Sequence, residues 1–247
     1  MNENIRIKEH SLLKSSILHT LPGLFTTGAF ILLKTLTDKI GCPPLLAFLL
    51  AILFVDIPII IAIILFEGIN INGKFSLKNI IGNNNKINLK TFILIFIGTF
   101  AVVFILITLI TPINDIITEK IFNKLPKWMF LNDPTQYKAY SKFILIAIFS
   151  FQFILTGIIL PFVEELYFRG FLLPRISRFG VWSVLWSGVL FAIYHCWQLY
   201  SFPILFVLGI SLGLVVWWKK DLRLSIALHV TANAVTRLWI LISIIMI

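Results

Sequence analysis

Seven long apolar runs separated by polar connections set the pattern of this chain. They occupy residues 16–36, 45–66, 91–111, 142–163, 181–199, 202–218 and 222–247. A helix of about 20 apolar residues crosses the roughly 30 Å hydrocarbon core of a bilayer. The pattern therefore predicts an all-α fold, a polytopic transmembrane bundle of about seven helices, with eight as the alternative. Residues 1–247 are expected to form a single membrane-embedded domain.

Composition supports a membrane protein. The chain is 59% hydrophobic and only 13% charged, with a mean hydropathy of +0.97. Soluble domains carry about 25% charged residues. The lipid bilayer is therefore the expected environment, and an integral, multi-pass membrane protein is the expected class.

The net charge of +10 predicts topology and not a nucleic-acid partner. Lysines and arginines are spread over the connections between apolar runs, without a basic stripe or aromatic platforms. Most of the 21 lysines and arginines fall in the connections on the side that holds the N-terminus. By the positive-inside rule, the N-terminus is expected to be cytoplasmic and the membrane to be the cytoplasmic membrane.

Two connections are long, and the cysteines are isolated. The polar stretch 70–90 centres on the letters GNNN at 82–85, which predict a solvent loop with turn chemistry. Cys42 and Cys196 lack the CxxC or metal-ligand spacing that predicts a disulfide framework or a zinc site. No internal repeat is visible, which argues against the duplicated halves of many transporters.

Polar and ionisable residues gather in the last third of the chain, in or beside apolar runs. A charged side chain at the centre of a bilayer costs about 2.5 to 3.5 kcal/mol on insertion scales, so such residues are functional-site candidates by default. The candidates are Glu164, Glu165, Arg169, His195, His229 and Asn233.

Helical spacing divides these residues into groups. Side chains at i and i+4 share one face of a helix, whereas neighbours point about 100° apart. Glu165 is therefore expected to pair with Arg169, which leaves Glu164 facing elsewhere. His229 and Asn233 share one face in the last run by the same spacing. Pro161, three residues before Glu164, can kink the chain or free a carbonyl beside the site.

A helical hairpin is expected to bring Glu164 to His195. The letters FG at 179–180 predict a break before the fifth apolar run. Both residues lie 15 to 16 positions from that turn. Two antiparallel helices with the same rise per residue then hold the two side chains at the same height.

Such a set of residues suits amide hydrolysis. A carboxylate in an apolar setting becomes a stronger base, and a neighbouring imidazole can share the proton of a water between them. A second imidazole and a carboxamide can donate hydrogen bonds to an oxyanion, at roughly 2.7 to 4 kcal/mol per donor. The expected substrate is a peptide or protein at the membrane.

Three motifs carry a resemblance to a known family. EELYFRG from Glu164, FAIYH at 191–195 and HVTAN at 229–233 resemble Glu-Glu-x-x-x-Arg, Phe-x-x-x-His and His-x-x-x-Asn. These are the motifs, in the same order, of the CAAX protease and bacteriocin-processing family (CPBP, type II CAAX endopeptidases, Abi proteins). The resemblance covers about residues 145–239, and the preceding part of the chain offers only hydropathy.

The resemblance implies a function and a role for each motif residue. It implies a bundle of eight or a similar number of helices and intramembrane proteolysis by a metal-independent hydrolase of the glutamate type, with no cofactor. Glu164 and His195 would activate water, and His229 with Asn233 would form the oxyanion hole. Glu165 and Arg169 would be supporting residues. The sequence ends 14 residues after Asn233, so an eighth span is not expected there.

Alternative functions stay open at the level of sequence. The two histidines and a glutamate could bind zinc, although no His-Glu-x-x-His motif is present. A non-enzymatic immunity or scaffold protein could use the same cavity to bind a partner, and a transporter ranks below both. Asp56, in the second run, could line the cavity or serve helix packing. Arg237 could neutralise a substrate carboxylate or extend outward to the membrane surface.

Overall fold

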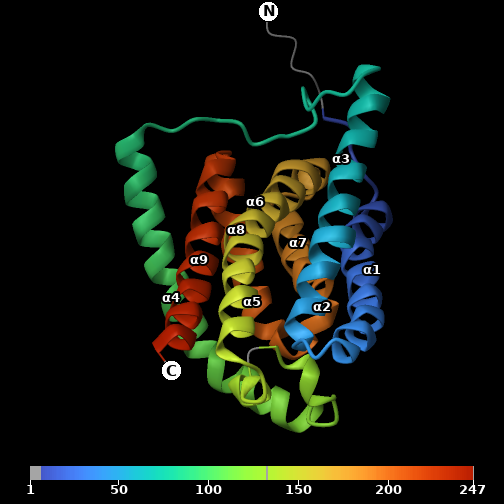
Figure 1. Cartoon of the computed structure of the whole chain (residues 1–247). Helices are drawn as coiled ribbons and strands as arrows, with labels where there is room; N and C mark the ends of the chain where they lie inside the picture. Colours follow the sequence, from blue (N-terminus) through green and yellow to red (C-terminus); the bar gives the residue numbers. More distant parts are fainter. Residues whose placement is uncertain (1–6, 132, 247) are drawn as a thin grey trace, which may run out of the picture.

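The computed structural model describes residues 7–131 and 133–246, and over these ranges it contains helices and no strands. Figure 1 shows them as one upright bundle. The long elements are α1 (Leu12–Lys39), α2 (Pro44–Ala51), α3 (Ile57–Asn72), α4 (Leu89–Ile121), α5 (Lys142–Ile154), α6 (Leu160–Glu165), α7 (Val181–Tyr194), α8 (Phe202–Lys219) and α9 (Leu222–Met246). Short π and 3-10 segments link some of them: η1 (Ile52–Asp56), η2 (Lys127–Met129), η3 (Pro134–Tyr137), η4 (Leu155–Ile159), η5 (Leu166–Leu172), η6 (Leu173–Phe179) and η7 (Cys196–Ser201).

The all-α membrane fold predicted from hydropathy is confirmed. By length and composition, six helices of the described residues can cross a membrane: Leu12–Lys39, Pro44–Asn72, Leu89–Ile121, Lys142–Phe179, Cys196–Lys219 and Leu222–Met246. The seventh apolar helix is the 14-residue α7. The expected count of about seven helices agrees with this arrangement.

The fifth apolar run differs from its predicted form. A helix through residue 199 was expected, but α7 ends at Tyr194 and the chain continues as the 3-10 segment η7. Irregular backbone is tolerated at membrane depth where protein covers it. Here Trp197 and Tyr200 are both buried, and the Trp197 ring packs against Phe48 of α2.

Two long spans contain a π segment followed directly by a proline. Pro58 lies just after η1, and Pro161 lies just after η4. Proline lacks an N–H and clashes with the carbonyl four residues earlier, so a widened π turn relieves the conflict. In both spans the helix continues past the proline. Both η1 and η4 lie within spans that carry buried polar residues near the centre of the bundle.

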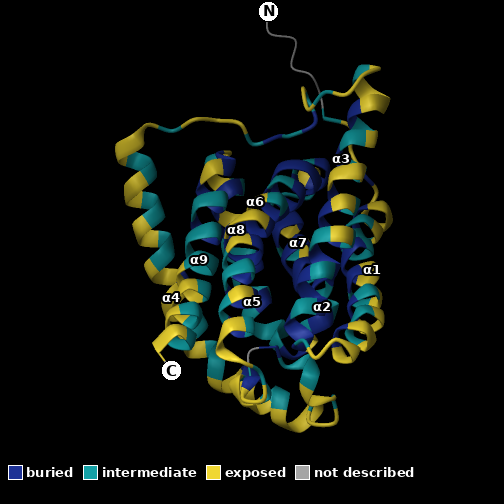
Figure 2. Cartoon of the chain, viewed as in Figure 1, coloured by how far each residue is buried: buried dark blue, intermediate teal, exposed yellow. Residues whose placement is uncertain are grey.

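The buried centre of the bundle lies among α1, α2, α5 and α7 (Figure 2). α7 packs on α8 and α1, α9 packs on α5 and on η4, and α1 packs on α2. α4 lies against α8 and α9 at the edge of the bundle, and most of its surface is uncovered. This arrangement places α6, the end of α7 and α9 around a common interior.

The connection between α3 and α4 crosses the end of the bundle where α3 ends (Figure 1). Its composition predicts a solvent loop, but the structure shows that it also forms hydrogen bonds to other parts of the bundle. The Gly82 N–H donates to the Gly170 carbonyl at 2.8 Å, and the Leu222 N–H donates to the Asn83 carbonyl at 2.9 Å. Asn83 adopts a φ of 57°, a left-handed conformation that asparagine tolerates better than most residues. The loop therefore ties η5 to the start of α9.

Asp221, at the turn between α8 and α9, anchors the same loop. Its carboxylate accepts the Ile87 N–H at 3.1 Å and the Arg223 guanidinium at 2.6 Å. Burial opposes ionisation, but the bonds from Arg223 and Ile87 outweigh it and hold the pKa of Asp221 below its usual range. The ionised form thus fastens α4, the loop and α9 together.

A close approach between α1 and α7 yields a stability prediction. A Cβ added at Gly23 would lie 1.8 Å from the Tyr194 carbonyl oxygen, whereas one added at Gly28 would meet nothing within 4 Å. We expect Gly23→Ala to destabilise the fold by about 1 to 3 kcal/mol or more, because the two backbones must separate. Gly28→Ala, the matched control, should be neutral or slightly stabilising. Thermal unfolding in detergent measures both, and equal melting temperatures would contradict the prediction.

Candidate active site

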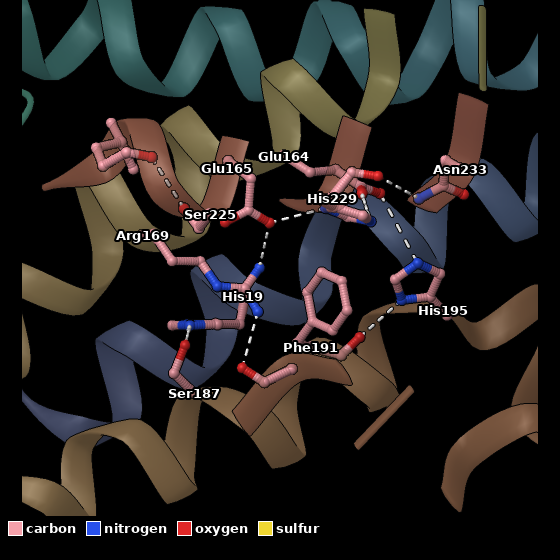
Figure 3. Close-up of polar contacts among 12 residues, drawn as sticks. His19, Glu164, Glu165, Arg169, Ser187, Phe191, His195, Ser225, His229 and Asn233 are labelled. Atoms are coloured by element: carbon pink, nitrogen blue, oxygen red, sulfur yellow. Dashed lines mark hydrogen bonds and ion pairs between the residues drawn. The ribbon is translucent and has the colours of Figure 1, made fainter. Parts of the chain in front are cut away.

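Four helical elements supply the six candidate residues (Figure 3). Glu164 and Glu165 end α6, and Arg169 lies in η5 directly after them. His195 is the C-cap of α7. His229 and Asn233 lie one turn apart on α9. The structure thus brings together residues that are up to 69 positions apart in the sequence, between Glu164 and Asn233.

Glu164 lies between the two histidines. Its Oε1 atom is 3.8 Å from Nε2 of His195, and its Oε2 atom is 3.8 Å from Nε2 of His229. The carboxylate is 2% exposed. A separation of 3.8 Å is too long for a direct hydrogen bond, but one water can bond to both groups at that spacing. The hairpin expected from the sequence is therefore present at this point.

The His195 ring is oriented by its own helix. Its Nδ1 atom lies 2.8 Å from the Phe191 carbonyl oxygen. A carbonyl only accepts hydrogen bonds, so Nδ1 carries the proton in this contact. In the neutral imidazole, Nε2 then has a free lone pair, directed toward Glu164. Two proton acceptors therefore face each other across the space where a water can bind.

Glu165 bonds to both Arg169 and His229 and so forms a second polar group. Oε1 of Glu165 accepts Arg169 Nη1 at 2.8 Å and His229 Nδ1 at 2.8 Å. The pairing of Glu165 with Arg169 that helical spacing predicted is confirmed. Nη2 of Arg169 donates to the Gly209 carbonyl at 3.0 Å, and its guanidinium lies 4.3 Å from the centroid of the Phe191 ring. The positive charge of Arg169 thereby balances the negative charge of the buried Glu165 carboxylate.

A small polar cavity of about 80 Å³ contains the reactive groups. Glu164, His195, His229 and Asn233 line it together. A single water needs about 10 to 15 Å³ of such volume, so several fit. A larger hollow of about 530 Å³ lies among α4, α8 and α9, but its lining is apolar apart from threonines. Of these two hollows, only the small cavity is lined by groups that can take part in acid–base chemistry.

The far wall of this cavity carries Arg237 and Gln152. Arg237 lies one turn beyond Asn233 on α9 and near Tyr137 and Tyr200. Of its two sequence-based interpretations, the inward one agrees with this position. Gln152 is 3% exposed and also lines the cavity. Amide and guanidinium groups thus extend the polar lining away from Glu164.

Asn233 lies at the rim of the reactive groups. Its Nδ2 atom donates to the His229 carbonyl at 3.2 Å, within α9. An amide nitrogen has two hydrogens, so this bond leaves one donor for a group in the cavity. His229 and Asn233 therefore line the same space, as their spacing on one helical face predicted.

Two contacts near the site were not predicted from the sequence. The Tyr194 hydroxyl donates to the carboxylate of Asp56, and Nδ2 of Asn83 donates to the Arg169 carbonyl at 2.9 Å. Both join segments that are far apart in the chain. The sequence places Asp56 within the second apolar run, but no spacing rule connects it to Tyr194. No signal in the sequence identifies Asn83 as a partner of Arg169.

Across residues 7–131 and 133–246, no group of three or more His, Cys, Asp or Glu side chains is arranged to hold a metal ion. Cys42 and Cys196 are free thiols.

Comparison with known families identifies the segment that carries the site. Residues 146–235 match the family described as "Type II CAAX prenyl endopeptidase Rce1-like". We refer to this segment as the Rce1-like domain. The match spans just over a third of the 247 residues, and it confirms the resemblance to the CAAX proteases that the three motifs indicate. No curated protein and no solved structure matches the chain.

The Rce1-like domain contains all six candidate residues. Its family supports a CAAX-type membrane protease, in agreement with the predicted hydrolase class. The apolar helices support an integral membrane protein. Asp56 and Asn83, which contact this domain, lie outside the matched residues.

Proposed function

We propose that this chain is an intramembrane endopeptidase of the glutamate type. It hydrolyses a peptide bond of a membrane-associated protein or peptide without a metal. The observation that carries the proposal is the position of Glu164, buried 3.8 Å from Nε2 of His195 in a cavity that can hold water. Two proton acceptors directed at one water suit a general-base mechanism.

In the first step, water attacks the scissile carbonyl carbon while its proton passes to Glu164, with His195 accepting the second hydrogen bond of that water. The carbon–oxygen double bond becomes a single bond, and the oxygen takes the electron pair. In the second step the tetrahedral intermediate collapses, the carbon–nitrogen bond breaks, and the proton held by Glu164 passes to the leaving amine. Glu164 therefore acts first as base and then as acid.

His229 and Asn233 supply the oxyanion donors in this proposal. The Glu165 carboxylate accepts the His229 Nδ1–H bond at 2.8 Å, which holds the imidazole ring in place beside the cavity. In this proposal an N–H at Nε2 of His229 and the remaining Nδ2 hydrogen of Asn233 are the two donors. Arg169 supports them indirectly, because it fixes the Glu165 carboxylate.

We further propose that the protein resides in the cytoplasmic membrane with a cytoplasmic N-terminus. The distribution of lysines and arginines supports this orientation. In this orientation η6 and the loop between α3 and α4 face the cytoplasm as well, since both lie at the end of the bundle where α1 begins: the His10 N–H donates to the Arg175 carbonyl, and the Gly82 N–H donates to the Gly170 carbonyl (Figure 1).

The proposal is tested with the purified full chain in detergent micelles. Peptide libraries are incubated with the protein, and products are identified by mass spectrometry in water labelled with oxygen-18. We expect cleavage with one labelled oxygen in the new carboxylate, and equal rates with and without a strong zinc chelator. Loss of activity with the chelator, restored by zinc, would support the zinc protease alternative. Function in cells without any cleavage would support the immunity or scaffold alternative.

Asn233→Ala gives a separate prediction about the oxyanion donors. We expect kcat to fall about 10²- to 10³-fold, because one donor to the developing negative charge is removed. KM should change little, since the donor acts mainly in the transition state. Thr236→Ala, on the same helix but outside the cavity, is the matched control and should keep full activity. Equal kcat values for the two variants would exclude Asn233 from the oxyanion hole.

A further inference from the structure

A separate apolar hollow of about 590 Å³ lies between α4 and α8. We call it the α4–α8 groove. It shares no lining residue with the polar cavity that contains the candidate catalytic residues. Val102 and Trp218, which line the groove, are 54% and 63% exposed. The groove is therefore open to the lipid that surrounds the bundle.

The length and lining of the α4–α8 groove suit a hydrocarbon chain. On α4 it extends from Ile95 to Leu106, about 16 Å by the rise of an α-helix, and one leaflet of bilayer hydrocarbon is about 15 Å deep. The lining is apolar apart from Thr99 and Ser211, and the Ser211 hydroxyl already bonds within α8. Gly98 lies within this length, and a Cβ added there would meet nothing within 4 Å. The missing side chain widens the groove.

Two tryptophans and two lysines form the mouth of the groove, where α8 ends. Trp217 and Trp218 line the groove. Nζ of Lys219 lies 3.4 Å from the centroid of the Trp218 ring, and Nζ of Lys220 lies 5.4 Å from that of Trp217. An ammonium group is attracted to the face of an indole, and tryptophans gather where hydrocarbon meets water. Two positive charges therefore lie at the mouth, at the level of lipid headgroups.

The positive charges around this mouth are not balanced by the protein. The basic residues before and within the first turn of α4 and at the turn between α8 and α9 are Lys86, Lys90, Lys219, Lys220 and Arg223. The one carboxylate in these segments, Asp221, bonds to Arg223 at 2.6 Å. Among the residues that the structure describes, Lys34 is the only lysine paired with a carboxylate. Lys219 and Lys220 therefore attract an anion from outside the protein.

We propose that the α4–α8 groove binds one anionic glycerophospholipid, with its phosphate at Lys219 and Lys220 and one acyl chain along the groove toward Leu106. Basic pockets between membrane helices bind anionic headgroups in this way. Because α4 has few buried residues of its own, the bound lipid holds it against α8. In the proposed orientation this lipid belongs to the cytoplasmic leaflet. Its binding does not depend on the proposed peptidase activity, because the groove and the active-site cavity share no lining residue.

Native mass spectrometry of the full chain in detergent micelles tests the headgroup contact, with phosphatidylglycerol as the anionic probe and phosphatidylcholine as the zwitterionic one. The wild type should bind phosphatidylglycerol more tightly. Lys219→Gln together with Lys220→Gln should weaken that binding about 30-fold, the effect of two cations beside an anionic headgroup, and leave phosphatidylcholine binding unchanged. Lys74→Gln together with Lys78→Gln, in the connection between α3 and α4 but outside the groove, is the matched control. Equal affinity of the wild type for both lipids, or equal losses in both pairs of substitutions, would overturn the proposal.

Gly98→Leu tests the position of the acyl chain. The leucine side chain would fill the groove, so phosphatidylglycerol binding should weaken about 10-fold, the effect of displacing two methylene groups. Gly28→Leu on α1 is the matched control, because a Cβ there also meets nothing within 4 Å and Gly28 lies outside the groove. Added phosphatidylglycerol should raise the melting temperature of the wild type and of Gly28→Leu more than that of Gly98→Leu. Wild-type binding by Gly98→Leu would exclude the groove as the site of the chain.

Discussion

Glu164→Gln is expected to reduce kcat/KM about 10³- to 10⁴-fold, the largest effect of any single substitution in this chain. The glutamine amide has nearly the same size as the carboxylate but cannot take a proton from water. Its loss also leaves His195 without the partner that lies 3.8 Å from its Nε2 atom. The measurement is the rate of peptide cleavage by the purified protein in detergent micelles.

The control for this variant is Glu119→Gln on α4. Glu119 is exposed and lies outside the cavity, so the same chemical change there should leave the rate unaltered. Melting temperatures of both variants should match that of the wild type within a few degrees, which separates catalysis from folding. A Glu164→Gln protein that keeps more than about a tenth of wild-type activity would exclude Glu164 as the general base.

Hydropathy predicted the fold well because lipid imposes a simple rule. Every backbone polar group within the bilayer must bond internally, so long apolar runs become helices. What hydropathy could not predict is where helices change their winding. The π segments before Pro58 and Pro161 arise from a local conflict that proline creates, and their exact extent depends on packing. α7 ends early because neighbouring helices cover the irregular segment after it.

The sequence predicts those contacts of the site that depend on local helical geometry, and it does not predict those that depend on the packing of distant segments. The pairing of Glu165 with Arg169 follows from i and i+4 spacing alone. The approach of Glu164 to His195 follows from a helical hairpin in which both residues lie at the same distance from the turn. The bond between Asp56 and Tyr194 joins residues 138 positions apart. That contact depends on how α1, the second span and α7 pack, and a single sequence contains no record of it. The catalytic roles and the single-domain organisation remain predictions.

The buried ion pair between Glu165 and Arg169 is also expected to stabilise the fold, and a stability experiment can separate this role from catalysis. Glu165 and Arg169 are 0% and 1% exposed, whereas Glu9 and Arg178, a comparable pair at the surface, are 48% and 38% exposed. Removing one partner of a buried pair leaves the other charge uncompensated at a cost of about 3 to 5 kcal/mol. An exposed pair contributes about 0 to 1 kcal/mol.

Arg169→Met is therefore expected to lower the free energy of unfolding by about 3 to 5 kcal/mol, and Arg178→Met, the matched control, by less than about 1 kcal/mol. Unfolding by a denaturing detergent in mixed micelles gives both values. Adding Glu165→Gln to Arg169→Met removes the stranded charge and should recover a large part of the loss. The recovered protein should still be catalytically weak, because His229 loses the carboxylate that accepts its Nδ1–H bond. If Arg169→Met unfolds like Arg178→Met, the guanidinium is not needed to balance the buried Glu165 carboxylate, and the predicted contribution of this ion pair to stability fails.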